Sequence, residues 1–206
     1  MGSTSNYSWP TPEATDLVKD GWDAIKDLGD AADTTVKSVA DGRGLVHINT
    51  TSFSAVASQS INDVFSATYD VYEIVCNITG STTSRIDLRV RVGGTDLSGA
   101  VYQLQTAGVS SATYTAQRDT NQTQIQIGTA RTTIKTSYTK ISNPFNTTVT
   151  NIVSTDADHS GGSVTSPAIA WNYGAVNNTT SYTGFTILAA SGNFTGSISV
   201  FGYRKS

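Results

Sequence analysis

The chain has 206 residues, of which 37% are hydrophobic and 14% charged, and its formal net charge is −3. This length fits one good-sized domain with an extension. The small content of basic residues argues against a nucleic-acid-binding protein, and no apolar run approaches the roughly 18 residues of a membrane-spanning helix.

The first 44 residues differ in composition from the rest of the chain. They hold 8 of the 16 acidic residues and 4 of the 13 basic ones, so their charges sum to 4 − 8 = −4, against 9 − 8 = +1 for the remainder. The remainder is rich in Thr, Ser, Asn and Gly. We therefore expect two domains: a helical anchor or oligomerisation segment over residues 1–44, and a β-sandwich over residues 45–206.

The first segment has the pattern of a helix. Thr11-Pro12-Glu13 is typical of a helix start, because a hydroxyl can cap the first turn and proline is tolerated there. A seven-residue spacing then places Val18, Ile25, Ala32 and Val39 at one heptad position and Gly21, Leu28 and Thr35 at its partner position, as in a weak coiled-coil seam. Gly21 is expected to interrupt the helix.

This helix requires neighbours to bury its apolar residues. The candidate anchor and oligomerisation residues are Val18, Trp22, Ile25, Leu28, Ala32 and Val39. Two alternatives stay open at this point. The helix folds back on its own β-domain, or it associates with other copies or with a larger assembly.

After a hinge at Asp41–Gly44, short alternating runs predict eight to ten strands and an all-β, jelly-roll-like sandwich. In the clearest run, Arg85–Val92, one face carries Ile86, Leu88, Val90 and Val92, and the other carries Arg85, Asp87, Arg89 and Arg91. The other expected strands are Leu45–Asn49, Thr51–Ala57, Tyr69–Thr79, Val101–Thr106, Thr123–Ile127, Lys135–Ile141, Thr148–Ser154, Ala168–Tyr173, Tyr182–Leu188 and Asn193–Tyr203.

The sequence contains no catalytic motif, so we do not expect an enzyme or a cofactor. Asp156, Asp158 and His159 could in principle ligate a metal, but a solvated loop is the favoured interpretation, and no metal site is predicted. Cys76, the single cysteine, lies in an apolar run and is expected to be an inert core thiol. With no secretory signal at the N-terminus, we expect synthesis in a cytoplasm.

Aromatic residues near the C-terminus are the candidate ligand-binding group. Trp171, Tyr173 and Tyr182 lie around an Asn-rich loop that includes Asn177 and Asn178. Sugars are commonly held by an aromatic ring that stacks on their apolar face, with amides bonding their hydroxyls. Burial of these rings in the core, or as plugs at turns, is an equally ordinary alternative.

Several stretches resemble tailed-bacteriophage fibre and minor structural proteins, including those of phages that infect aquatic bacteria such as cyanobacteria. They are Asp16–Gly29, which resembles an attachment segment, and Thr51–Phe53, Ile61–Tyr72, Arg85–Arg91, Asn143–Phe145, Tyr182–Leu188 and Ser191–Tyr203, which resemble the β-domain of that family. These stretches cover both ends and much of the middle of the chain.

The resemblance implies a virion structural protein: a small tail or head fibre, spike or capsid-decoration module that attaches to the host surface. It implies a homotrimer whose partners are other proteins of the tail or capsid and a host-surface glycan, located in the virion after synthesis in the host cytoplasm. Alternatives are a free lectin-like carbohydrate-binding domain, a purely structural decoration protein without receptor binding, and, last, a depolymerase.

Overall fold

The computed structural model describes residues 2–13, 15, 17–42, 44–110, 113–159 and 167–205. The chain divides into two compact units, residues 1–44 and residues 45–205. The division falls at the Asp41–Gly44 hinge expected from the change in composition. Each unit is therefore described by itself.

The N-terminal unit pairs a short hairpin with one long helix. The hairpin consists of β1 (Gly2–Ser3) and β2 (Pro10–Thr11), and it is followed by the 3-10 turn η1 (Val18–Asp20) and by α1 (Gly21–Gly42). The expectation of a helix start at Thr11 is wrong, because Thr11 pairs with Gly2 in the hairpin. The hairpin is closed at Thr4, whose side-chain oxygen accepts a hydrogen bond from the Trp9 amide at 3.0 Å.

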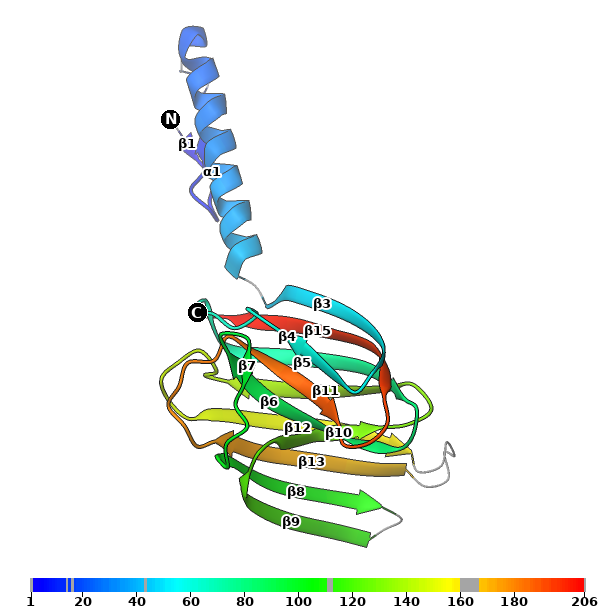
Figure 1. Ribbon diagram of the computed structural model, residues 1–206. Helices are drawn as coiled ribbons and strands as arrows, with labels where there is room; N and C mark the ends of the chain where they lie inside the picture. The colour runs from blue at the N-terminus through cyan, green and yellow to red at the C-terminus, as the bar shows by residue number, and fades with distance from the viewer. Residues whose placement is uncertain are drawn as a thin grey trace. The chain divides into compact units, whose positions relative to one another are not determined.

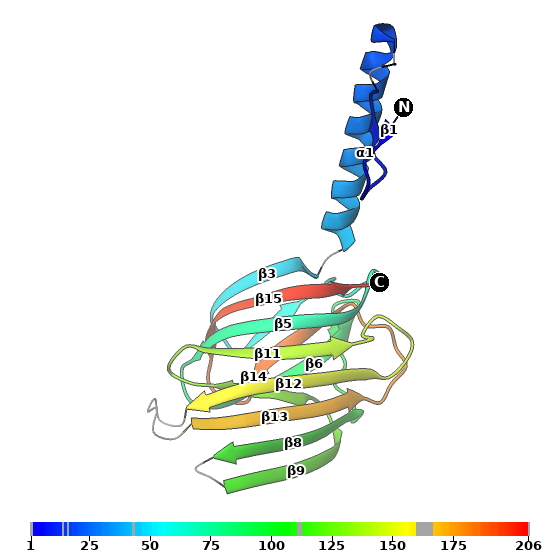
Figure 2. The same cartoon turned by 180° about the vertical axis from the view of Figure 1, so that it is seen from behind.

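The second unit consists of two antiparallel sheets. Figures 1 and 2, which show opposite sides, place the smaller sheet in front of the larger one in the first view and behind it in the second. The smaller sheet contains, in spatial order, β10 (Ile125–Ala130), β6 (Ser84–Val92), β14 (Gly184–Ala189) and β4 (Ser58–Ile61), with β7 (Thr95–Asp96) paired to β6. The larger sheet contains, in spatial order, β3 (Leu45–Val56), β15 (Phe194–Arg204), β5 (Tyr69–Gly80), β11 (Lys135–Ser142), β12 (Thr150–His159), β13 (Pro167–Val176), β8 (Tyr102–Ser110) and β9 (Thr113–Gln122).

Eight of these strands have the order of a jelly roll. In one sheet the neighbours are β3-β15-β5-β11, and in the other β4-β14-β6-β10. Ranked by position along the chain, these are strands 1-8-3-6 and 2-7-4-5, which is the strand order of two interlocked Greek keys. The predicted β-sandwich of jelly-roll type is confirmed.

Two hairpins are inserted into this jelly roll. The β8–β9 hairpin lies between β6 and β10 in the chain, and the β12–β13 hairpin lies between β11 and β14. Both extend the larger sheet beyond β11, in the order β12-β13-β8-β9. Because the smaller sheet ends at β10, the larger sheet acquires an extension that the jelly roll itself does not need.

The core lies between the two sheets. Leu88, Phe185 and Val200 are completely buried there, as are Tyr72, Tyr102, Ile125, Ile127, Ile141, Tyr182, Ile187 and Ile198. Cys76 is 1% exposed and has a pKa that burial raises to about 12, which confirms an inert core thiol.

The alternation of β6 is confirmed over Ile86–Val90, although the face with the charged residues is not fully exposed to solvent. Ile86, Leu88 and Val90 are buried as expected, but Val92 at the end of the strand is 43% exposed, so its place in the buried row is wrong. Asp87 on the opposite face is also only 1% exposed. Asp87 forms an ion pair with the Arg85 Nε at 2.8 Å and accepts a hydrogen bond from Gln124 Nε2 at 2.7 Å. These partners cover a carboxylate that alternation alone assigns to water.

Sequence pattern missed several strands and divided another. The predicted strands Leu45–Asn49 and Thr51–Ala57 are one continuous strand, β3. In the β-unit, β4, β7 and β9 were not predicted, and neither were β1 and β2 of the N-terminal hairpin. All residues of β9 are exposed or half-buried, so it has no apolar alternation that a pattern could detect. No helix among the described residues has the length and hydropathy of a membrane span.

Candidate functional site

The helix α1 and the turn before it expose a continuous apolar stripe. Val18 is 97% exposed, Trp22 71%, Ile25 66%, Val36 62% and Val39 38%. Together with Gly29 and Ala32 these positions follow the spacing 18, 22, 25, 29, 32, 36, 39, with steps of four and three residues. This is the spacing at which side chains from two or more helices interlock in a coiled coil. We call these seven residues the helix stripe.

The N-terminal hairpin covers the face of α1 next to the helix stripe. Trp9 Nε1 donates a hydrogen bond to Thr35 Oγ1 at 2.9 Å, and Ala24 is 2% exposed. Leu28 and Ala31, which share this face, are half-buried. Within this unit, the hairpin therefore covers the face of α1 that contains Ala24 and Thr35, and the helix stripe stays exposed.

The expected rows of the seam agree with the structure in part, and the seam itself stays a prediction. Val18, Ile25, Ala32 and Val39 do form one row of the helix stripe. The proposed partner row of Gly21, Leu28 and Thr35 is wrong, because Thr35 and Leu28 lie on the face next to the hairpin; the exposed partner row is Trp22, Gly29 and Val36. The signal available in the sequence was that Trp22 and Val36 are larger and more apolar than Gly21 and Thr35.

The face of α1 opposite the helix stripe is polar. Lys26 and Asp30 form an ion pair of one helical turn at 2.6 Å, and Thr34 donates to the Asp30 carbonyl at 2.8 Å. Asp23, Asp27 and Ser38 on this face are exposed as well. This separation of faces distinguishes a helix that docks on one side from one that is solvated all round.

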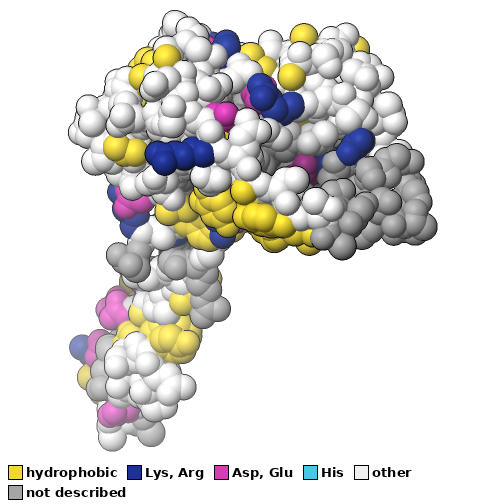
Figure 3. All heavy atoms as spheres, turned by 90° about the horizontal axis from the view of Figure 1, so that it is seen from below, with side chains coloured by type: hydrophobic (Ala, Val, Ile, Leu, Met, Phe, Trp, Pro, Cys, Tyr) yellow, Lys and Arg dark blue, Asp and Glu magenta, His cyan; other side chains and the backbone are white. Residues whose placement is uncertain are grey.

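The structure brings together only part of the predicted aromatic platform. Trp171 and Tyr173 lie on the outer face of β13, where Trp171 is half-buried and Tyr173 is 47% exposed. Register adds neighbours on the same face, because Trp171 pairs with Thr155, which pairs with Tyr138, and Tyr173 pairs with Val153. Figure 3 shows a band of hydrophobic side chains across one side of the β-unit.

The other members of the predicted platform lie elsewhere. Tyr182 is completely buried in the core, where burial raises its pKa, so its assignment to an exposed stacking surface is wrong. Asn177 and Asn178 follow the end of β13, and six extended residues place Asn177 roughly 20 Å from Trp171. The Asn178 side chain accepts hydrogen bonds from the amide and hydroxyl of Thr180 and thus stabilises its own loop.

The acidic residues considered as metal ligands do not form a described site. Asp156 lies in β12 and is 1% exposed; its Oδ2 is 2.8 Å from Lys135 Nζ and accepts the Thr129 amide at 2.9 Å. The side chains of Asp158 and His159 lie outside the described residues. Among the residues that are described, no group of three His, Cys, Asp or Glu side chains is placed to hold a metal ion.

These features define a jelly-roll protein with a separate helical unit, whose own hairpin leaves an apolar stripe of the helix uncovered. Compared with protein-family models, with curated proteins and with solved structures, the chain shows no significant match.

Proposed function

We propose that the chain is a virion structural protein: a small fibre, spike or decoration module that is anchored by its helical unit and presents its jelly roll for attachment to the host surface. The observation that carries this proposal is the helix stripe. A stripe of seven positions at coiled-coil spacing belongs to a unit distinct from the jelly roll, which buries its own core. Such a division of labour suits assembly at one unit and presentation at the other.

The occupant proposed for the helix stripe is a second and third copy of the same chain. Heptad spacing is matched best by an identical stripe, because each side chain then enters a hole formed by its counterparts. Gly29 and Ala32 at the middle of the stripe allow close approach of helices, and a Cβ added to Gly29 would meet no atom within 4 Å in the single chain. A homotrimer that docks on other proteins of a tail or capsid is the proposed assembly.

The assembly half of the proposal is tested with the intact chain. Ile25→Asp combined with Val36→Asp places charges on the helix stripe, and Thr34→Asp combined with Ser38→Asp adds the same charge on the opposite face. Size-exclusion chromatography with light scattering should give a trimer for the wild type and the control pair, and a monomer for the stripe pair. A wild-type monomer at micromolar concentration, or equal disruption by both pairs, contradicts self-assembly through this surface.

The proposed location in the virion is tested on purified phage particles. Mass spectrometry of purified phage particles from cells that produce the chain should detect it, and electron microscopy with antibodies against the jelly roll should label a fixed site on the particle. Absence of the chain from washed particles, with free chain in the supernatant, would instead favour the lectin-like alternative.

A further inference from the structure

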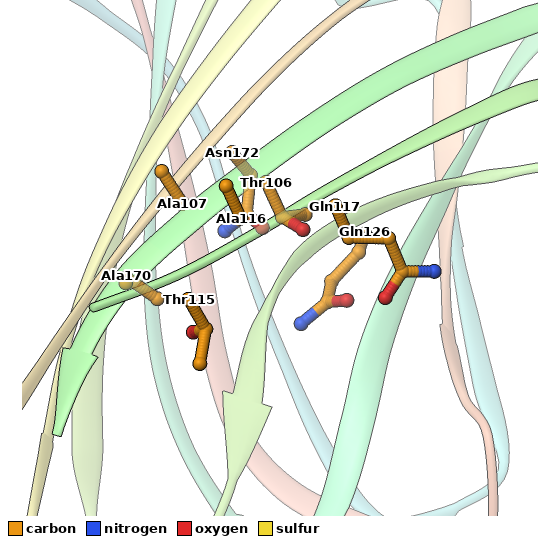
Figure 4. A pocket seen from close by; sticks show the side chains of 9 residues that line it. Thr106, Ala107, Thr115, Ala116, Gln117, Gln126, Ala170 and Asn172 are labelled. Atoms are coloured by element: carbon orange, nitrogen blue, oxygen red, sulfur yellow. The ribbon is translucent and has the colours of Figure 1, made fainter. Parts of the chain in front are cut away.

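The sheet extension forms the floor of a pocket beside the edge of the smaller sheet. The pocket has a volume of about 250 Å³ and is lined by residues of β13, β8 and β9, with Gln126 of β10 completing it. Figure 4 shows Gln117 and Gln126 at one side and Ala170 and Thr115 at the other. The pocket thus lies where the two inserted hairpins extend past the jelly-roll strands that would otherwise cover them.

The inner face of β8 changes character where the pocket begins. Tyr102 and Leu104 are buried in the core, whereas the next two inward positions are Thr106 and Gly108, both half-buried. Residues directly opposite each other on paired strands share a face of the sheet. Thr106 therefore shares its face with Asn172 of β13, and Gly108 with Ala170.

Neighbouring β9 continues the same two rows, because Gln117 lies opposite Thr106 and Thr115 opposite Gly108. The row of Asn172, Thr106 and Gln117 thus presents two carboxamides and a hydroxyl. The other row has no side chain at Gly108, where an added Cβ would lie 3.1 Å from the Ile169 carbonyl oxygen, 3.8 Å from Thr115 Oγ1 and 3.9 Å from the Ala170 Cα. A strand with large apolar residues on this face would have closed the space.

Asn172 is the most informative residue of the pocket. Its side chain is 2% exposed, and neither its amide nitrogen nor its oxygen has a hydrogen-bond partner in the structure. Adjacent buried hydroxyls in the same row are satisfied: Thr139 donates to Ser154 at 3.0 Å, and Ser154 bonds the Ile127 carbonyl. An unpaired buried carboxamide costs free energy, and a ligand that entered the pocket could supply the hydrogen bonds that the fold does not give Asn172.

We propose that this pocket binds one neutral, hydroxyl-rich ring, a single glycosyl unit of an uncharged surface polysaccharide, with Asn172 at its centre. None of the nine lining residues is charged, which disfavours phosphate, sulfate and carboxylate ligands. A carboxamide both donates and accepts, as a sugar hydroxyl does, and Asn172 and Gln126 supply two of them. Gln117 supplies a third, whose Nε2 already donates to the Asp119 carboxylate at 2.9 Å, so that its oxygen is the atom left to accept. The volume is below the ~300–1,000 Å³ of pockets for drug-sized ligands and suits one ring.

The biological setting of this site rests on the proposed attachment role, but its chemistry does not depend on the helix stripe. It also differs from the predicted aromatic platform, since Asn172 points to the opposite face of β13 from Trp171 and Tyr173.

The test uses the intact chain and a panel of neutral sugars: glucose, galactose, mannose, rhamnose and N-acetylglucosamine. Saturation-transfer NMR and titration of the side-chain amide signals should identify at least one sugar that binds and that shifts the signal lost in Asn172→Leu. That variant should weaken binding about tenfold or more, and Thr106→Val, which removes one hydroxyl at constant shape, about two- to tenfold. Asn151→Leu makes the same exchange on the outer face of β12 and should leave binding unchanged.

Thermal stability separates a ligand-binding Asn172 from a structural one. Because its carboxamide has no partner to lose, Asn172→Leu should keep or raise the melting temperature while binding is lost. A lowered melting temperature together with unchanged sugar binding would show that Asn172 supports the fold and would overturn the assignment.

Other results of the same binding experiments would also overturn or support the sugar site. Failure of every neutral sugar at its highest soluble concentration overturns the proposal, as does stronger binding of glucuronate or of N-methylacetamide, which would indicate an acidic sugar or a peptide segment. The monomeric Ile25→Asp, Val36→Asp variant should bind the sugar as the wild type does per chain. If the wild-type chain binds the sugar but stays monomeric, the result supports the proposed pocket and contradicts the proposed anchor. The two proposals can therefore fail independently.

Discussion

The helix α1 and the strand β6 each carry a regular apolar row, yet the two rows end in opposite surroundings. In β6, Ile86, Leu88 and Val90 are at most 2% exposed, because the larger sheet covers them. In the helical unit, Val18 and Ile25 are 97% and 66% exposed, although their spacing is as regular. Periodicity thus fixes which side chains share a face, whereas only the tertiary structure shows whether the unit that contains the element covers that face.

The largest expected effect exploits this difference directly. Leu88→Ala removes a completely buried side chain and should lower the free energy of unfolding of the β-unit by about 2–5 kcal/mol. Ile25→Ala removes an exposed one and should change that free energy by less than about 0.5 kcal/mol. Urea denaturation followed by tryptophan and tyrosine fluorescence measures both, and comparable losses would mean that the two rows share one core.

Gly29 gives a smaller effect in the helical unit. Introduced into the stripe variant Ile25→Asp, Val36→Asp, which is expected to be monomeric, Gly29→Ala should stabilise α1 by about 0.5–1 kcal/mol, because alanine loses less backbone entropy on folding and its Cβ meets open space in the single chain. Far-UV circular dichroism during thermal unfolding measures this gain. The matched exchange Gly174→Ala in β13 should be destabilising instead, since its Cβ would lie 2.5 Å from the Gln103 carbonyl oxygen.

The same contrast between covered and open surfaces extends to charge. Burial raises the pKa of Asp87 above its ordinary value of 3.8, against the opposing effect of Arg85. Between pH 3.8 and this raised pKa the folded state retains a proton that the unfolded state releases, so the contribution of Asp87 to stability falls as pH rises through that window.

Asp87→Asn should therefore flatten the dependence of stability on pH just above 3.8, as measured by denaturation at a series of pH values. Asp70, at an exposed position, has a pKa that hydrogen bonds from Lys205 and Asn146 lower. Its contribution is present above pH 3.8 and is lost as pH falls through the lowered value, so Asp70→Asn should alter the profile only below 3.8. An unchanged profile in Asp87→Asn would contradict the buried state of that carboxylate.

The smallest expected effect is the most direct test of two separate units. The stripe variant Ile25→Asp, Val36→Asp should leave the unfolding transition of the β-unit unchanged, because all residues of the jelly-roll core lie after residue 44. Calorimetry of this variant beside the Thr34→Asp, Ser38→Asp control measures it. A drop in the β-unit transition confined to the stripe variant would show that the helix stripe packs on the sandwich.

The sequence by itself determined the boundary near residue 44, the all-β class and the strands with strong patterns. Four expected strands agree with the structure within one residue or two, because their alternation reflects a face that is buried against the opposing sheet. They are Tyr69–Thr79, Arg85–Val92, Lys135–Ile141 and Asn193–Tyr203, which correspond to β5, β6, β11 and β15. The heptad row of Val18, Ile25, Ala32 and Val39 was likewise readable, since it depends only on spacing along one helix.

Tertiary structure alone decided what lies beside each of those faces. It assigned Leu28 and Thr35 to the face next to the hairpin, through the Trp9–Thr35 hydrogen bond between residues 26 positions apart. It also buried Tyr182, and it gathered Asn172, Thr106 and Gln117 into one pocket by pairing two inserted hairpins. The sequence singled out the aromatic neighbours of Asn172 instead, because a polar residue on the covered face of a strand has no local pattern that distinguishes it from one in water.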